Sequence, residues 1–183
     1  MMHRDLASAL ADSELLFDRA AIAAAITAIA EAIDAEYEGG ERPVFLSVMH
    51  GGLLFAGQLA LQMKTDLEFD YLHATRYRGA LTGSGLAWLH RPATPLRGRR
   101  VLIADDILDE GHTLKAVKHW CEDEGALDVR IAVLAVKDHD RRVEGIEADW
   151  VALEVPDRYV YGFGMDFHEQ GRNLPGLYAL NTP

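Results

Sequence analysis

The sequence has a single cysteine, Cys121, and no long uninterrupted apolar run. One cysteine cannot form an intramolecular disulfide or a zinc site built on cysteines, and such scarcity is typical of a reducing compartment. The apolar stretches end well short of the roughly 18 residues that a membrane span requires, and the N-terminal residues lack the continuous apolar core of a secretory signal. We therefore expect a cytoplasmic protein that does not enter a membrane.

Basic residues are outnumbered, with 18 lysines and arginines against 29 aspartates and glutamates and a formal charge of −11. This excess repels nucleic acids and anionic lipids, so we expect neither as a partner. A phosphate-bearing ligand would need a local site made of backbone amides, cations or a metal. With 49% hydrophobic and 26% charged residues, the composition is that of an ordinary globular protein, and we expect one domain over residues 1–183.

Hydrophobic periodicity predicts helices that alternate with strands. Isoleucines at helical spacing indicate an amphipathic helix over residues 18–37, capped by Asp18, and a second helix is expected over 53–63. The Gly- and Thr-containing range 78–95 is expected to be a long loop, poorly ordered without ligands. Apolar runs predict strands at 44–48, 67–77, 101–104, 129–136, 150–155 and 159–163. The alternation indicates an α/β fold with a mostly parallel sheet flanked by helices.

The sharpest segment is the acidic turn at residues 101–114, VLIADDILDEGHTL, which predicts a strand, a turn and the start of a helix. Ligands of open α/β sheets bind beyond the carboxyl ends of the strands, where Asp105 and Asp106 stand. The amides from Asp109 to Thr113 and the helix N-terminus suit one phosphate, although the Gly-Lys-Ser/Thr of a P-loop is absent. The residues alone also fit two solvated acids at a strand end, followed by a helix cap.

This turn resembles the phosphoribosyl diphosphate (PRPP) binding motif of the type I phosphoribosyltransferases. Further segments, in order, resemble the hypoxanthine-guanine branch of that family: 47–52 its pyrophosphate loop, Lys137 its purine-binding lysine, and 156–166 its base-binding segment, with 172–175 closing the match. The resemblance covers about residues 44–180. It implies the type I phosphoribosyltransferase fold with a small hood from the terminal segments. It also implies Mg²⁺-dependent transfer of ribose 5-phosphate from PRPP to hypoxanthine or guanine, in a homodimer or homotetramer.

The resemblance assigns roles to individual residues. Asp109 would manage the N7 proton of the purine, and Lys137, which can only donate, would favour a 6-oxo over a 6-amino group. The implied PRPP contacts are Asp105, Asp106, Asp109, Glu110, Gly111, His112 and Thr113. The implied pyrophosphate contacts are His50, Gly51 and Arg172; the purine contacts are Lys137, Tyr159 and Val160; the metal ligands are Asp105, Asp106 and Asp166. The family also has a mobile loop, here with Arg76 and Tyr77, and a non-proline cis peptide, here between Met49 and His50.

Several positions depart from the family pattern. His50 replaces a common lysine, Arg76 stands where Ser-Tyr usually begins the mobile loop, and Glu110 places negative charge beside the expected phosphate. His112 can compensate for Glu110 if it is protonated. His139 and Asp140 form no metal-binding spacing, and we expect them to be solvated.

Three alternatives stay open from the sequence. The residues alone would also allow Lys137 to be a solvated lysine and Tyr159 a half-buried strand aromatic. The enzyme could instead prefer xanthine or adenine. A PRPP-sensing, RNA-binding regulator is the third, and a charge of −11 disfavours it.

Overall fold

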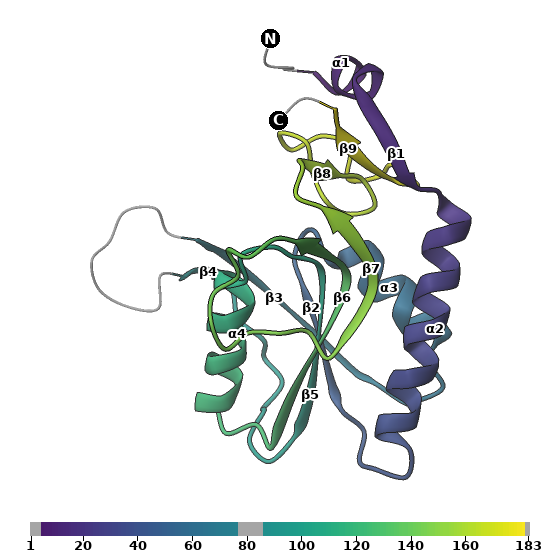
Figure 1. Cartoon of the computed structure of the whole chain (residues 1–183). Helices are drawn as coiled ribbons and strands as arrows, with labels where there is room; N and C mark the ends of the chain where they lie inside the picture. The colour runs from purple at the N-terminus through teal and green to yellow at the C-terminus, as the bar shows by residue number, and fades with distance from the viewer. Residues whose placement is uncertain (1–4, 77–85, 182–183) are drawn as a thin grey trace.

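The protein consists of a body built on one sheet and a smaller hood above it (Figure 1); the computed structural model describes residues 5–76 and 86–181. The body sheet has the order β4-β3-β2-β5-β6-β7, with β4 antiparallel to β3 and the other neighbours parallel. Its strands are β2 (Val44–Val48), β3 (Glu68–Arg76), β4 (Leu86–His90), β5 (Arg100–Leu108), β6 (Asp128–Asp138) and β7 (Trp150–Pro156). The expected mostly parallel α/β sheet is confirmed.

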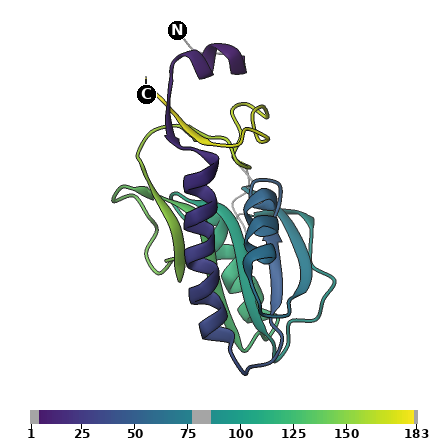
Figure 2. The same ribbon diagram turned by 90° about the vertical axis from the view of Figure 1, so that its right-hand side faces the viewer.

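Helices cover both faces of this sheet. Helices α2 (Arg19–Tyr37) and α3 (Leu53–Gln62) lie on one face, where Figure 2 shows them side by side, and α4 (His112–Asp123) lies on the other. Successive strand residues point to opposite faces. Phe45 of β2 accordingly packs in the core with α2 and α3, whereas its neighbour Leu46 packs in the core with α4.

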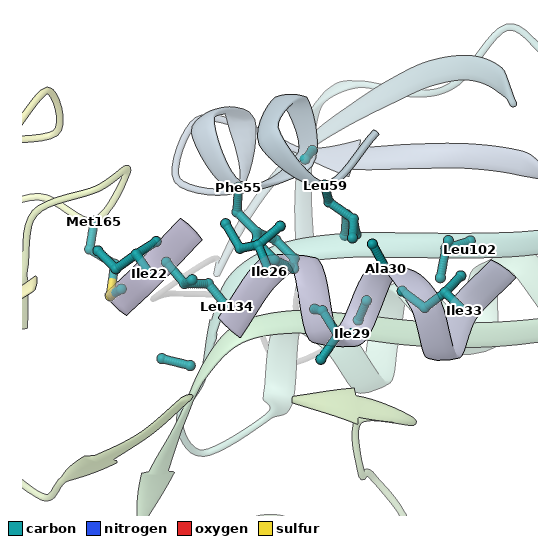
Figure 3. Packing of buried hydrophobic residues seen from close by; sticks show 14 of the residues in the cluster. Ile22, Ile26, Ile29, Ala30, Ile33, Phe55, Leu59, Leu102, Leu134 and Met165 are labelled. Carbon is teal, nitrogen blue, oxygen red and sulfur yellow. The ribbon is translucent and has the colours of Figure 1, made fainter. Parts of the chain in front are cut away.

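Helix α2 follows the predicted periodicity. The N–H of Ala21 donates to the Asp18 carboxylate at 2.8 Å, so Asp18 caps the helix as expected. The isoleucines turn inward onto α3 and strands β5 and β6 (Figure 3), and Ile22 also packs with Met165 from the base-binding segment. Burying each of these side chains contributes up to about 1.5–3 kcal/mol, so α2 is a main source of stability for the body.

The hood joins the two ends of the chain. It contains α1 (Leu6–Ala11), β1 (Ser13–Phe17), β8 (Val160–Tyr161) and β9 (Leu177–Leu180), and its antiparallel sheet has the order β1-β9-β8. The hydroxyls of Ser13 and Tyr161 are hydrogen-bonded at 2.8 Å, and the Arg158 guanidinium donates to the Leu180 carbonyl at 2.8 Å and to the Glu14 carboxylate at 2.6 Å. The expected hood of terminal segments is confirmed.

Some expected boundaries were wrong. Residues 86–90 were expected to lie in a loop, yet they form β4, because this apolar segment pairs with the edge of β3. Strand β5 does not stop before its acids, since its ladder with β6 continues to Leu108, and β6 likewise extends through Lys137. The strand expected at 159–163 is reduced to the two residues of β8.

The structure describes only part of the segment that was expected to form a mobile loop. Arg76 is the last residue of β3, whereas Tyr77 and the expected mobile loop up to residue 85 lie outside the described residues. None of the helices within residues 5–76 and 86–181 is long and apolar enough to cross a membrane.

Candidate active site

Two adjacent carboxylates stand near the carboxyl end of β5. Asp105 is buried, and its Oδ1 accepts the N–H of Asp106 at 2.9 Å; Asp106 Oδ1 in turn accepts the N–H of Ile107 at 2.7 Å. Burial raises the pKa of both carboxyls, and the charge of Asp106 raises the pKa of Asp105 further. Such a pair is suited to ligands that bring hydroxyl donors or a cation, because these would offset the cost of keeping the two carboxylates charged.

The turn that follows forms a polar hollow at the start of α4. A cavity of about 280 Å³ is lined by residues 105–107 and 109–114, and it therefore includes the backbone of the expected phosphate loop. Gly111 immediately precedes α4 with φ of 84°, and a β-carbon there would press on the side chain of Ile146. The N-terminal amides and dipole of this twelve-residue helix favour an anion, as the sequence indicated for Gly111, His112 and Thr113.

Asp109 occupies a different environment between two donors. Lys137 Nζ donates to Asp109 Oδ2 at 2.7 Å, and His139 Nε2 lies 2.7 Å from Asp109 Oδ1. Burial alone would raise the pKa of Asp109, but the hydrogen bonds from Lys137 and His139 outweigh it and hold the pKa below its ordinary value. Asp109 is therefore a stable carboxylate, and it lines the cavity described above.

His139 also belongs to the candidate site, and sequence reasoning missed it. It was expected to be solvated, yet its side chain is only 2% exposed, because the segment after β6 turns it back onto Asp109. One signal was available: residues two apart in a strand share a face, so an extension of β6 places His139 on the same side as Lys137. Asp140 is exposed, as expected.

The pyrophosphate loop packs directly against the acids. The Met49–His50 peptide is cis, as the resemblance predicted. A β-carbon on Gly51 would collide with the Asp106 carboxylate, and one on Gly164 would collide with the Gly51 carbonyl. Glycine at these positions thus allows the loop, strand β5 and the base-binding segment to meet.

A second histidine joins this loop. The His50 and His73 rings meet edge to face, with centroids 4.4 Å apart. Burial, followed by the charges of His50 and Arg172, lowers the pKa of His73. Sequence reasoning did not single out His73, because its position depends on β3 lying beside the loop.

The base-binding segment presents one aromatic ring and one ion pair. Tyr159 is half exposed, its ring contacts Phe167 edge to face at 5.6 Å, and its hydroxyl donates to the Asp166 carbonyl at 3.3 Å. Arg172 pairs with Asp166 at 2.7 Å and donates to the Gly164 carbonyl at 2.9 Å. The exposed face of Tyr159 remains available for a planar ligand, and Val160 beside it is buried in β8.

The three expected metal ligands do not form a ready-made cage. Within residues 5–76 and 86–181, no three His, Cys, Asp or Glu side chains are grouped so that they could hold a metal ion. Asp166 instead pairs with Arg172, and only Asp105 and Asp106 form a carboxylate pair. This donor set suits Mg²⁺, which takes one or two carboxylates and completes its shell with water and substrate phosphates.

A parallel sheet with an acidic turn, a phosphate hollow at a helix N-terminus and a hood over them defines the type I phosphoribosyltransferase class. Comparison with known proteins agrees with the fold. The phosphoribosyl transferase domain family matches residues 12–169, and the chain belongs to this family.

The similar proteins point to one branch of the family. The hypoxanthine-guanine phosphoribosyltransferase of Lactococcus lactis is 36% identical over 153 residues, which cover 83% of this chain and 82% of that protein. A hypoxanthine phosphoribosyltransferase structure from Staphylococcus aureus has a TM-score of 0.85 at 25% identity, covering 99% of this chain and 98% of that one. The hypoxanthine phosphoribosyl transferase of Trypanosoma cruzi, studied for the effect of its C-terminal region on oligomeric state and activity, also has a TM-score of 0.85 at 25% identity, covering 91% of this chain and 90% of that one.

Proposed function

We propose that this enzyme transfers ribose 5-phosphate from PRPP to hypoxanthine or guanine, giving IMP or GMP and pyrophosphate in purine salvage. The observation that carries the proposal is the Lys137–Asp109 contact of 2.7 Å beside the phosphate hollow. It joins a donor for the 6-oxo group to a carboxylate for the imidazole edge of a purine, at the side of the site where ribose phosphate would bind. The hypoxanthine-guanine relatives support the same assignment.

The proposed reaction breaks the bond between ribose C1 and pyrophosphate and forms a bond from C1 to purine N9. Positive charge develops on the ribose, and the carboxylates of Asp105, which is buried, and of Asp106 would bind its hydroxyls and stabilise that charge. Lys137 would shift from Asp109 to the 6-oxo oxygen, and Asp109 Oδ2 would then take the N7 proton. Tyr159 would stack on the base, with the backbone of Val160 at its edge.

The remaining roles concern the leaving group. His50, the amide of Gly51 and Arg172 would bind pyrophosphate, and Arg172 already influences Asp106 electrostatically. Mg²⁺, held by Asp105 and Asp106 with water and PRPP oxygens, would neutralise the charge that builds up on the departing pyrophosphate. Asp166 would act on this side through its ion pair with Arg172.

The test is PRPP-dependent release of pyrophosphate with Mg²⁺ and each of hypoxanthine, guanine, xanthine and adenine. We expect turnover with hypoxanthine and guanine, and adenine slower by at least about 10²-fold, because a lysine cannot accept a hydrogen bond from a 6-amino group. Turnover with xanthine or adenine alone would assign a different base preference. No turnover with any base, together with tight RNA binding, would assign the regulatory alternative.

We also propose that the chain forms a homodimer through an apolar surface on α3 and β3, here called the α3–β3 face and comprising Leu53, Leu54, Leu61, Phe69 and Tyr71. Leu61 is 82% exposed and Phe69 64% exposed. Phe69 pairs in register with Phe45, so it points to the side of the sheet that α3 covers. Apolar side chains gathered in this way on a small protein mark an interaction surface.

Light scattering after size exclusion tests this assembly. The wild-type protein is expected to have the mass of a dimer, and Leu61→Lys or Phe69→Lys the mass of a monomer. Leu127→Lys is the matched control, because Leu127 is also exposed, at 73%, but lies outside the α3–β3 face. A monomeric wild type, or a dimer that both variants preserve, would contradict the proposed interface.

A further inference from the structure

The contacts of His139 determine which of its ring nitrogens carries the proton. The backbone N–H of Arg141 donates to His139 Nδ1 at 3.0 Å. A backbone N–H is only a donor, so Nδ1 must present a lone pair, and the proton of the neutral ring is on Nε2. His139 therefore donates from Nε2 to Asp109 Oδ1 across 2.7 Å.

Charged groups from several elements lie near the His139 ring, so the charge of the group that donates to Asp109 affects the basicity of that carboxylate. They are Asp109 and Glu110 before α4, Lys137 on β6, Arg141, Arg142 and Glu147 between β6 and β7, and Glu154 and Asp157 at the end of β7. Arg141 donates from both of its terminal nitrogens to Asp157 at 2.7 Å, and it acts on Asp109 through its charge alone. The nearby cation on the Asp109 carboxylate is thus Lys137.

We propose that His139 is a positioning residue for the proton-accepting carboxylate, holding Asp109 through Oδ1 as a neutral donor while Oδ2 exchanges Lys137 for the purine. This inference rests on the proposed function. The two oxygens of Asp109 have separate tasks: Oδ1 remains bonded to His139 throughout, and Oδ2 is released when Lys137 moves to the 6-oxo group. The N7 proton passes to Oδ2 as the C1–N9 bond forms and the C1–pyrophosphate bond breaks.

A neutral anchor is better suited to this task than a second cation. A positive charge on Oδ1 would stabilise the carboxylate further and make it a weaker proton acceptor. A neutral N–H fixes the plane of the carboxylate with less effect on its basicity. Without His139, Asp109 would keep Lys137 as its partner in the free enzyme and lose both fixed partners once the base binds.

Substitutions that keep or remove the donor test the role. His139→Leu removes the donor while retaining bulk, and we expect kcat to fall about tenfold, the usual scale for losing an orienting partner, with KM for PRPP unchanged. The acid limb of the kcat–pH profile should move to higher pH, because the pKa of Asp109 rises when one of its hydrogen bonds is lost. His139→Gln, whose amide nitrogen can occupy the position of Nε2, should restore most of kcat and the wild-type acid limb.

His119→Leu is the matched control, since this histidine is exposed on α4 and pairs only with Glu122 among its described contacts. It should leave kcat and the pH profile unchanged. If His139→Leu is folded by circular dichroism yet keeps the wild-type kcat and acid limb, the positioning role is overturned. If His139→Leu does not fold, His139→Gln is the deciding variant. Its kcat–pH profile must keep the wild-type acid limb. A shift of that limb to higher pH, as expected when the donor is lost, would contradict the proposal.

The tautomer can be measured independently of activity. In a ¹⁵N-histidine NMR spectrum of the free wild-type enzyme, His139 should show a pyridine-like Nδ1 and a pyrrole-like Nε2 at neutral pH. The opposite tautomer or a fully protonated ring would overturn the proposal, even in an active enzyme. If the tautomer is as expected but the enzyme turns over no purine, the proposed function fails while the assigned His139–Asp109 hydrogen bond stands.

Discussion

The acidic turn contains two kinds of carboxylate only three residues apart. Asp105 and Asp106 are enclosed side by side, and within residues 5–76 and 86–181 neither forms an ion pair; burial raises the pKa of both. Asp109 already has Lys137 and His139 on its two oxygens, and these bonds lower its pKa. The first pair is thus incomplete until a ligand arrives, whereas Asp109 is oriented in advance. The difference supports the proposed division of roles, with ligand binding at one end of the turn and proton transfer at the other.

The largest effect should come from breaking the proton-transfer end. Asp109→Asn keeps the shape of the side chain but cannot accept the N7 proton, so turnover with hypoxanthine or guanine should fall by about 10²-fold. PRPP binding should be retained, because Asp105 and Asp106 are untouched. Steady-state kinetics with isothermal calorimetry of PRPP provide the measurement, and an unchanged kcat would refute the role of Asp109.

A substitution at the ligand-binding end of the turn should stabilise the protein but weaken PRPP binding. Asp106→Asn removes one charge of the buried pair, so the Tm at pH 7 should rise by about 2–4 °C, corresponding to about 1 kcal/mol, while KM for PRPP rises about tenfold. The folded-state pKa of Asp106 lies above its unfolded value, so the wild-type penalty is complete above the folded pKa. The penalty disappears as the pH falls to the unfolded value. The Tm difference should therefore shrink toward pH 4, as calorimetry would show, and an equal gain at both pH values would contradict this origin.

A change at the purine side should affect selectivity more than rate. Lys137→Gln introduces an amide whose oxygen can accept from a 6-amino group, so the preference for hypoxanthine over adenine in kcat/KM should fall by about tenfold. Lys64→Gln is a control with the same chemistry on an exposed lysine remote from the acidic turn. Unaltered selectivity in Lys137→Gln would separate this lysine from base recognition.

The smallest effect is expected at the phosphate hollow. Glu110 and His112 lie 3.5 Å apart, and both side chains are more than 40% exposed, so solvent weakens their influence on a bound phosphate. Glu110→Gln should lower KM for PRPP by about twofold to threefold, because it removes a negative charge close to the bound phosphate. Steady-state kinetics provide the measurement, and a KM that rises instead would show that Glu110 assists binding.

Local patterns were sufficient for much of the fold and for the chain positions of the site. The isoleucine spacing located α2, and the apolar runs located β2, β5 and β6. The motifs also located the acids and the glycine-bearing loops. The boundaries at Lys137 and at β4 were wrong because they are decided by ladder partners elsewhere in the chain.

The missed histidines have the same explanation. His139 becomes buried only when the segment after β6 folds back over Asp109, and His73 meets His50 only when β3 lies beside the pyrophosphate loop. The spacing of two residues along an extended β6 indicated only that His139 shares a face with Lys137, and no local pattern indicated either contact. Residue type and periodicity thus indicate which groups are present at the site, while the partners of each group depend on contacts distant in sequence.

The pairing of β1 with β9 determines the order in which the two halves of the site can be completed during synthesis. Ser13 lies opposite Leu180, so the hood cannot close until the chain through β9 has left the ribosome. The six body strands end at Pro156 and can fold earlier, because the N-terminal part of a chain emerges first. The acidic turn, the phosphate hollow and Lys137 can therefore be in place before the hood closes over them. A nascent chain stalled before β9 should therefore be able to bind PRPP while the hood is still open.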